Sequence, residues 1–245
     1  MSEIYNIMNN DLSEAVEEAY KILRANIQFS ETEKKIKTLA LTSYSPGEGK
    51  STTSLNLSIS MTKIGMNVLY VDADMRKPMP FKYLASKNIY GLSNYLLGQA
   101  NLQEITNQTN IAGFNFINCG IKPTNPSELL SSDQFSQFLH EVEPLYDIII
   151  IDTPPLGSVI DGVIIASQTD QTIIVIEANA VKSKNLLAMK KQLIAANVNI
   201  LGVVLNKVKK SDYLGYYGSY DYYGSKKKYR KKWFYGVGKK RSKHD

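Results

Sequence analysis

A short stretch of glycine, lysine and hydroxyl residues has the composition needed to hold phosphate groups. It reads SPGEGKS over residues 45–51, follows an apolar strand-like segment at 38–43 and precedes a helix-like segment at 52–64. Glycine lets backbone N–H groups close around an anion, lysine adds positive charge, and a helix N-terminus points its dipole at the same place. The segment is therefore predicted to be a P-loop, with Tyr44 at the first position, where the pattern has glycine.

The predicted ligand of this loop is ATP with Mg²⁺. Lys50 is expected at the β- and γ-phosphates, and the Ser51 hydroxyl on the metal ion. Asn206, at the end of the last strand-like segment, is expected to contribute to the adenine pocket. The predicted nucleotide contacts are Pro46, Gly47, Glu48, Gly49, Lys50, Ser51, Thr52 and Asn206.

Two other apolar segments end in carboxylates. Residues 147–151 lead into Asp152, a Walker B pattern whose carboxylate holds Mg²⁺ directly or through water. Residues 67–71 lead into Asp72 and Asp74, which share one face of an extended segment. Two like charges this close need a cation or a proton between them, and a Mg²⁺–nucleotide complex supplies the cation. One carboxylate of the pair is expected to bind metal, and the other to accept a proton from an attacking hydroxyl.

The strand-like segments predict the fold. They are rich in Ile, Val and Leu, alternate with helix-like stretches, and cover 38–43, 67–71, 114–118, 147–151, 171–176 and 200–206. Continuous apolar strands are typical of a parallel sheet covered on both faces. Strands that alternate with helices indicate a doubly wound α/β domain, which binds ligands at the carboxyl ends of its strands. We therefore predict a P-loop NTPase domain over 35–208, with a mostly parallel sheet and helices on both faces.

Composition excludes two broad classes. The chain has 245 residues, of which 43% are hydrophobic and 21% charged, as in ordinary soluble globular proteins. No apolar run reaches the roughly 18 residues that span a bilayer, and the first residues lack the order of a signal peptide. The single cysteine, Cys119, is compatible with a reducing cytoplasm and is expected to be buried. An integral membrane protein and a disulfide-stabilised secreted protein are both disfavoured.

The region before the sheet is predicted to be an amphipathic helix, with Asp11 as its N-cap. Apolar residues recur there at spacings of three and four, namely Leu12, Val16, Ala19, Leu23 and Ile27. The opposite face carries Glu14, Glu17, Glu18, Lys21 and Arg24. From the residues alone, this charged face is a solvated surface with ion pairs one helical turn apart.

After about Val208 the pattern changes. Half of the 16 tyrosines lie there among Gly, Ser, Lys and Arg, at positions Tyr213, Tyr216, Tyr217, Tyr220, Tyr222, Tyr223, Tyr229 and Tyr235. Residues 226–245 contain ten Lys and Arg and one acid, so the net charge of +6 belongs to this segment and the rest is net negative. Since no helical or strand period organises apolar residues there, we predict a flexible tail over 209–245.

These motifs together resemble the bacterial tyrosine kinases of capsule and exopolysaccharide synthesis. The resemblance is closest to the cytoplasmic Gram-positive type, whose membrane adaptor is a separate protein, and it covers nearly the whole chain. It rests on residues 46–52, 71–78, 125–130 and 148–155 and on the tyrosine cluster; the segment 71–78 resembles the additional Walker A′ element of that family. This combination is more specific than a P-loop alone.

The resemblance implies a role for each matching position. Lys50 would contact phosphates, Ser51, Asp74 and Asp152 would belong to the metal shell, and Asp72 would be the base for the tyrosine hydroxyl. Residues 1–34 would form an oligomerisation region. Glu18, Lys21 and Arg24 match its E-x-x-R-x-x-R motif with lysine at the middle position, and subunits would form a ring. The implied phosphoacceptors are Tyr213, Tyr216, Tyr217, Tyr220, Tyr222 and Tyr223.

The resemblance also implies partners and a location. A membrane adaptor would activate the kinase at the inner face of the cell membrane, and a cognate phosphotyrosine phosphatase would reverse the reaction. The basic and aromatic residues at 226–235 suit anionic lipid or nucleic acid. We favour a membrane contact and expect no specific nucleic acid.

The predicted function is an ATP-dependent tyrosine kinase that phosphorylates its own tail between subunits and regulates polysaccharide synthesis and export. One alternative is a switch ATPase related to plasmid-partition and septum-positioning ATPases. Those relatives carry a lysine early in the P-loop, where this chain has Ser45. The other alternative is a nucleotide-bound scaffold without catalysis.

Overall fold

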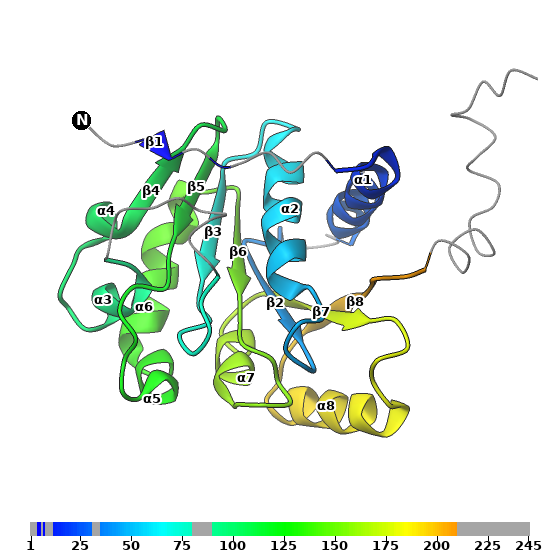
Figure 1. Cartoon of the computed structure of the whole chain (residues 1–245). Helices are drawn as coiled ribbons and strands as arrows, with labels where there is room; N and C mark the ends of the chain where they lie inside the picture. Colours follow the sequence, from blue (N-terminus) through cyan, green and yellow to red (C-terminus); the bar gives the residue numbers. More distant parts are fainter. Residues whose placement is uncertain (1–3, 6, 8–11, 31–34, 80–89, 210–245) are drawn as a thin grey trace, which may run out of the picture. The chain divides into compact units, whose positions relative to one another are not determined.

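The computed structural model describes residues 4–5, 7, 12–30, 35–79 and 90–209 (Figure 1). The chain divides into two units, residues 1–207 and 208–245. The tyrosine-rich tail predicted at 209–245 lies outside the described residues apart from Lys209, and so do all eight of its tyrosines. The sheet, the helices and the predicted nucleotide site belong to the first unit.

One sheet forms the centre of the described part of the chain (Figure 1). It has eight strands in the order β1-β4-β5-β3-β6-β2-β7-β8. Neighbouring strands are parallel except for the antiparallel pair β4 and β5. The strands are β1 (Ile4–Tyr5), β2 (Thr38–Ser43), β3 (Val68–Asp72), β4 (Thr106–Thr109), β5 (Phe114–Ile117), β6 (Ile148–Asp152), β7 (Gln171–Glu177) and β8 (Ile200–Asn206). The predicted mostly parallel sheet is confirmed.

Every strand predicted from an apolar run is present, with ends that differ by at most one residue. The prediction missed β1 and β4. β1 is only two residues long, and β4 reads Thr-Asn-Gln-Thr, so neither contains an apolar run. β4 is also the strand that breaks the parallel order, by pairing antiparallel with β5.

Helices cover both faces of the sheet, as predicted (Figure 1). On one face, α1 (Glu14–Phe29) and α2 (Lys50–Thr62) bury residues against β2, β3, β5, β6 and β7. The core on the other face includes residues of the remaining helices. These are α3 (Leu92–Leu96), α4 (Leu102–Ile105), α5 (Pro126–Leu130), α6 (Asp133–Val142), α7 (Asp161–Ala166) and α8 (Ser183–Ala195). A short 3-10 helix, η1 (Glu143–Leu145), precedes β6.

Alternate residues of each central strand enter different cores. In β3, Val68 and Tyr70 belong to the core under α2, whereas Leu69 and Val71 belong to the other core. The period of two is invisible in the sequence because both faces are buried and apolar, as expected of central parallel strands. The parity of a residue in β3 or β6 therefore tells which core it faces.

The first helix packs differently from its predicted apolar face. Tyr20, Leu23 and Ile27 lie in or against the core under α2, whereas Val16 is 41% exposed. The N-cap is Ser13 and not Asp11, which lies outside the described residues. Polar groups also take part in the contact with α2: Arg24, predicted on the charged face, donates to the Ser60 carbonyl oxygen.

Among the described residues, no helix combines the length and the apolar character required to cross a bilayer.

Candidate nucleotide and phosphoryl-transfer site

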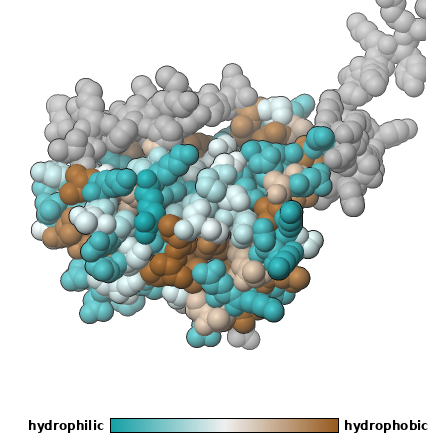
Figure 2. All heavy atoms as spheres, turned by 60° about the horizontal axis from the view of Figure 1, so that its bottom comes forward, coloured by the Kyte–Doolittle hydropathy of each residue, from teal (hydrophilic) through white to brown (hydrophobic). Residues whose placement is uncertain are grey.

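The predicted P-loop joins β2 to α2 at the carboxyl ends of the central strands, the edge at the bottom of Figure 1, which Figure 2 turns toward the viewer. Gly47 and Gly49 have φ angles of 85° and 94°, in the left-handed region that favours glycine. A Cβ atom on Gly49 would lie 2.1 Å from Nδ2 of Asn206. Asn206 in turn donates to the Glu48 carbonyl oxygen at 2.9 Å. The end of β8 thus braces the loop, and the predicted adenine contact of Asn206 stays a prediction.

Tyr44 occupies the position where the P-loop pattern has glycine. Its backbone does not adopt a positive φ, so the conformation does not require glycine there. The Tyr44 carbonyl oxygen accepts from the Gly157 N–H at 2.9 Å, and a Cβ atom on Gly157 would lie 3.2 Å from the Tyr44 ring. The glycine of this contact is therefore Gly157, in the loop after β6, and the tyrosine ring packs over it.

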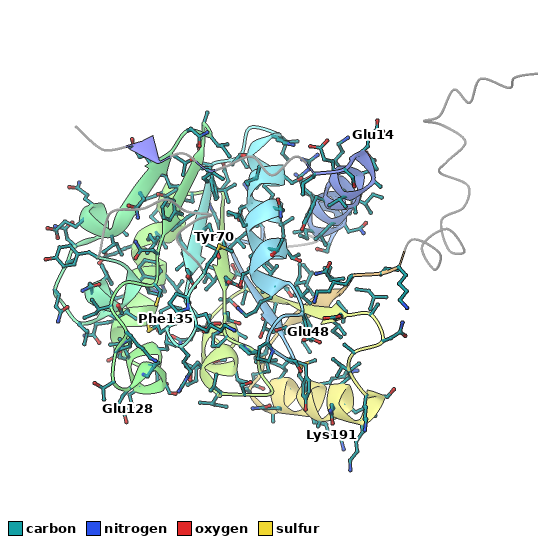
Figure 3. The ribbon with its side chains drawn as sticks, in the orientation of Figure 1. Glu14, Glu48, Tyr70, Glu128, Phe135 and Lys191 are labelled. Carbon is teal, nitrogen blue, oxygen red and sulfur yellow. The ribbon has the colours of Figure 1, made fainter. Side chains whose placement is uncertain are left out.

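Glu48 is a charged residue buried inside the loop. It is 2% exposed, and its Oε2 accepts from the Ser45 N–H at 2.8 Å. Its Oε1 is buried without a hydrogen-bond partner among the described residues. The Glu48 side chain therefore fixes the start of the loop through its hydrogen bond with the Ser45 backbone. Figure 3 labels Glu48 beside the lower end of α2, where the loop leads into the helix.

Lys50 lies at the point where the predicted site residues meet. Its Nζ is 3.2 Å from Asp74 Oδ2, 3.4 Å from Asp152 Oδ1 and 3.1 Å from Ser51 Oγ. Burial opposes the charged form, but the carboxylates of Asp152, Asp74 and Asp72 outweigh it and raise the pKa of Lys50. The lysine is therefore a buried cation among acids. A phosphate and a metal ion bound here would change which groups balance its charge.

The two acids after β3 have separate surroundings. Asp74 faces Lys50 and accepts from the Lys77 N–H at 2.9 Å through Oδ1. Asp72 accepts from the N–H groups of Asp74 at 3.1 Å and Met79 at 2.8 Å, one on each oxygen. Asp72 is thus fixed by the segment that follows it. The sequence placed both acids at one site, and the structure distinguishes their contacts.

Asp72 and Asp152 are direct neighbours across two parallel strands. Burial and the negative charge of Asp152 raise the pKa of Asp72 to about 7, against the opposing effects of the Met79 N–H and Lys50. Burial also raises the pKa of Asp152, although the charge of Lys50 works in the other direction. The site therefore concentrates more negative charge than Lys50 alone balances, which favours the entry of a further cation.

Oxygen donors of the kind that Mg²⁺ prefers already surround one cationic atom here. Ser51, Asp74 and Asp152 each place an oxygen within 3.1–3.4 Å of Lys50 Nζ. Within the described residues, no group of three or more His, Cys, Asp or Glu side chains could hold a metal ion. Mg²⁺ is usually held by one or two carboxylates together with substrate phosphates and water, and Asp74 and Asp152 supply two carboxylates beside the Ser51 hydroxyl. The residues present therefore fit the predicted ion.

Two contributors to this edge of the sheet were missed by sequence reasoning. Tyr70, fully buried in β3, donates its hydroxyl to Asp152 Oδ2 at 3.4 Å. Strand parity could have found it, because Tyr70 lies two residues before Asp72 and so on the same face. Arg76 is the other: it binds Asp161 through Nε at 2.7 Å and Nη2 at 3.0 Å. No spacing rule links residues so far apart in the chain.

The Arg76 contact also shows how the segment 125–130 is held beside the loop after β3. Ser127, in α5, donates to Asp161 Oδ1 at 2.6 Å and accepts from Arg76 at 3.1 Å. Asp161 is buried at the start of α7; hydrogen bonds from Arg76 and Ser127 lower its pKa although burial acts in the opposite direction. The cluster ties the loop after β3 to α5 and α7.

The residues predicted for oligomerisation lie apart from this site, on α1. Glu18 and Lys21 form an ion pair at 3.0 Å, and both side chains are about half exposed. Arg24 instead reaches α2 through the Ser60 carbonyl and hydroxyl oxygens. The three residues therefore do not form one continuous outward face in this chain, and the subunit contact stays a prediction.

The strand–loop–helix at residues 38–62, with a lysine among carboxylates, defines a P-loop nucleotide-binding protein. Residues 36–201 match a family model described as an AAA domain. Tyrosine-protein kinase CpsD of Streptococcus agalactiae is 40% identical over 228 residues, which cover 92% of this chain and 98% of CpsD. Tyrosine-protein kinase YwqD of Bacillus subtilis is 34% identical over 206 residues, which cover 83% of this chain and 87% of YwqD.

A solved structure agrees with these relatives. The kinase domain of Escherichia coli tyrosine kinase ETK superposes with a TM-score of 0.76 at 32% identity, covering 79% of this chain and 76% of that domain. The chain belongs to the bacterial tyrosine-protein kinases. The resemblance inferred from the motifs is thereby confirmed.

Proposed function

We propose that this kinase transfers the γ-phosphoryl group of Mg²⁺–ATP to tyrosines in the tail of a neighbouring subunit. The observation that carries the proposal is the convergence of Lys50, Ser51, Asp74 and Asp152 at the carboxyl edge of the sheet. In the reaction, the phenol oxygen bonds to the γ-phosphorus, the bond to the ADP oxygen breaks, and the phenol proton is lost. Lys50 would stabilise the negative charge that develops on the phosphoryl group and on ADP.

Asp72 is the residue proposed to take the phenol proton. The free phenol has a pKa near 10 and is a poor nucleophile at neutral pH, so a carboxylate within reach assists the attack. Asp72 is opposite Asp152 in the strand register, and backbone N–H groups fix both of its oxygens. This support keeps the carboxylate in one orientation beside the phosphate site.

Mg²⁺ is proposed to be held by Asp74, Asp152 and the Ser51 hydroxyl. When bound, the ion would neutralise charge on the β- and γ-phosphates. Pro46, Gly47, Glu48, Gly49 and Thr52 would complete the phosphate loop. Asn206 would act at its edge, where it already braces the Glu48 carbonyl.

The proposed acceptors are Tyr213, Tyr216, Tyr217, Tyr220, Tyr222 and Tyr223, in the tail 209–245. Each phosphate adds about −1.5 to −2 charges at pH 7, so several would cancel the basic excess of the tail. Added negative charge would repel neighbouring tails and the acid-rich site, and a cognate phosphatase would restore the starting state. Sedimentation tests this: equal masses for the phosphorylated and unphosphorylated protein would refute a phosphorylation-dependent ring.

We also propose that the kinase works in capsular or extracellular polysaccharide synthesis and export, at the inner face of the membrane through an adaptor. Support comes from the match to capsule-type kinases by family and motif, and from the basic tail, which suits anionic lipid. The region 1–34 would provide subunit contacts through Glu18 and Lys21, which are exposed on α1. The domain 35–208 would carry the chemistry.

Mass spectrometry of tail peptides tests the central claim. Wild type and Lys50→Met are produced and incubated with and without Mg²⁺–ATP, in the presence of a cytoplasmic adaptor segment. We expect phosphotyrosine within residues 213–235 only in the wild type with Mg²⁺–ATP. ADP release by a wild type whose tail stays unmodified would indicate a switch ATPase, and nucleotide binding without turnover would indicate a scaffold.

A further inference from the structure

Tyr70 places a polar group in the middle of a buried strand that is otherwise apolar up to Asp72 at its end. The residue is fully buried in β3, and the strand reads Val-Leu-Tyr-Val-Asp. A buried hydroxyl is unfavourable unless it has a hydrogen-bond partner, and phenylalanine would fill nearly the same space without that requirement. The position of the hydroxyl is therefore informative. Figure 3 labels Tyr70 within the sheet, above the carboxyl edge where the site lies.

The strand register points this hydroxyl at Asp152. Tyr70 is opposite Ile150 in the neighbouring strand β6, so Tyr70 and Asp152 lie on the same sheet face, one step apart diagonally. The hydroxyl is 3.4 Å from Asp152 Oδ2 and 3.8 Å from Met79 Sδ. A phenol has one proton to donate, and a carboxylate is a much better acceptor than a thioether. The proton therefore belongs to the contact with Asp152.

The two oxygens of Asp152 have different partners as a result. Oδ1 lies 3.4 Å from Lys50 Nζ and 3.4 Å from the Ser54 hydroxyl oxygen, which also donates to the Lys50 carbonyl oxygen at 2.8 Å. Oδ2 faces the core and accepts from Tyr70. Asp152 is completely buried, so no bulk water can replace a lost partner. Without the phenol, Oδ2 would lose this donor, and the carboxyl plane would lose one of the contacts that fix its orientation.

We propose that Tyr70 is a positioning residue for the metal and phosphate site: its O–H fixes Oδ2 of Asp152, so that Oδ1 faces the cation. The inference rests on the proposed Mg²⁺ role of Asp152 and adds a residue to it. Partners behind a metal ligand commonly change metal affinity by about 10- to 100-fold when they are removed. Tyr70 itself contacts neither the nucleotide nor the acceptor tyrosine in this scheme.

The test compares Tyr70→Phe with wild type and with a matched control, using the full-length chain. The control is Tyr146→Phe, which removes the same atom just before the other end of β6, where the Tyr146 hydroxyl accepts from Asn115 at 3.0 Å. Mn²⁺ affinity in the presence of ADP is measured by electron paramagnetic resonance. ADP affinity without metal is measured by calorimetry, and the melting temperature is recorded.

We expect about 10-fold weaker Mn²⁺ binding for Tyr70→Phe, unchanged metal-free ADP binding, and wild-type behaviour for Tyr146→Phe. Equal Mn²⁺ affinity in Tyr70→Phe and wild type would overturn the proposal. An unfolded Tyr70→Phe, or one that loses metal-free ADP binding to the same extent, would also overturn it, because the hydroxyl would then serve the fold. A wild type that binds no Mn²⁺ with ADP would overturn both the metal assignment and the role of Tyr70.

Phosphotyrosine formation by the wild type is measured separately. Its absence would contradict the proposed kinase reaction, whereas the Mn²⁺ comparison would still decide whether Tyr70 positions Asp152.

Discussion

Two clusters of oppositely charged side chains flank the loop 153–160 in sequence, one around Lys50 and Asp152 and the other around Arg76 and Asp161. They differ in how well the positive and negative charges within each cluster balance. Lys50 is shared between Asp74 and Asp152 at 3.2 and 3.4 Å. Arg76 binds Asp161 through two nitrogens at 2.7 and 3.0 Å, and Ser127 adds a contact of 2.6 Å. The Lys50 cluster has longer contacts and more carboxylates than cations. The Arg76 cluster has shorter contacts and pairs one guanidinium group with one carboxylate.

The difference distinguishes a ligand-binding site from a cluster that stabilises the fold. Long contacts and unbalanced acids are unfavourable to the fold, and they are retained where a bound ligand can complete the charge balance. A bidentate arginine–carboxylate pair with an added hydroxyl needs no ligand, and it holds secondary elements together. We therefore expect substitutions in the Lys50 cluster to change the reaction, and substitutions in the Arg76 cluster to change stability.

Asp152→Asn is expected to have the largest effect. Phosphoryl transfer should fall by about 10²- to 10³-fold, because one of the two carboxylates proposed to hold the charge-neutralising Mg²⁺ is lost. The melting temperature should stay the same or rise, since burial raises the pKa of Asp152 and its ionised form therefore opposes folding at neutral pH. Tail phosphorylation and thermal unfolding are measured on the same preparation. A large loss of stability would show that the Lys50 cluster also stabilises the fold, against this distinction between the two clusters.

Gly157→Ala tests the loop between the two clusters. Its Cβ atom would lie 2.6 Å from the Tyr44 carbonyl oxygen, so the P-loop or the loop after β6 must shift. Overpacking of this kind costs about 1–3 kcal/mol, and we expect weaker nucleotide binding by up to about tenfold. Gly202→Ala is the control, because a Cβ atom there meets nothing within 4 Å. Similar nucleotide affinities for both variants would show that the Tyr44 contact does not shape the loop.

Asp161→Asn should lower stability and affect nucleotide binding little. Loss of the charged hydrogen bonds from Arg76 and Ser127 is expected to cost about 2 kcal/mol, or roughly 4–8 °C in melting temperature for a domain of this size. Arg76→Lys provides a milder companion, since lysine cannot form the bidentate contact. Chemical denaturation and nucleotide titration measure the two effects. An unchanged melting temperature would remove the distinction between the clusters.

The pH dependence of Asp161 gives the smallest effect. Its folded pKa is lowered from 3.8, so its ionised form stabilises the fold above that value, and the contribution is lost as the pH falls through the folded pKa. The difference in melting temperature between wild type and Asp161→Asn should therefore be constant from about pH 5 to 7 and shrink below about pH 4. A melting-temperature difference that grows in acid would mean that the substitution does not act by removing the Arg76–Asp161 ion pair.

Much of this architecture could be predicted from local pattern. The strands that end at Ser43, Asp72 and Asp152 were identified because buried parallel strands are continuous apolar runs, and polar residues follow where they leave the core. The polar strand β4 and the packing side of α1 could not be predicted in this way. Both depend on a partner element: β5 for the strand, and Ser60 of α2 for Arg24.

The sequence by itself determined the chemical groups of the site and the edge of the sheet at which they meet. Glycine, lysine and carboxylate positions follow directly from strand ends, because parallel strands deliver their carboxyl ends to one edge. Only the tertiary structure decided that Gly157 accommodates Tyr44, that Asp72 is tied to the Met79 N–H, and that Tyr70 donates to Asp152. Those contacts join residues from different strands and loops. They depend on register, parity and packing across the sheet, which no spacing within one segment records.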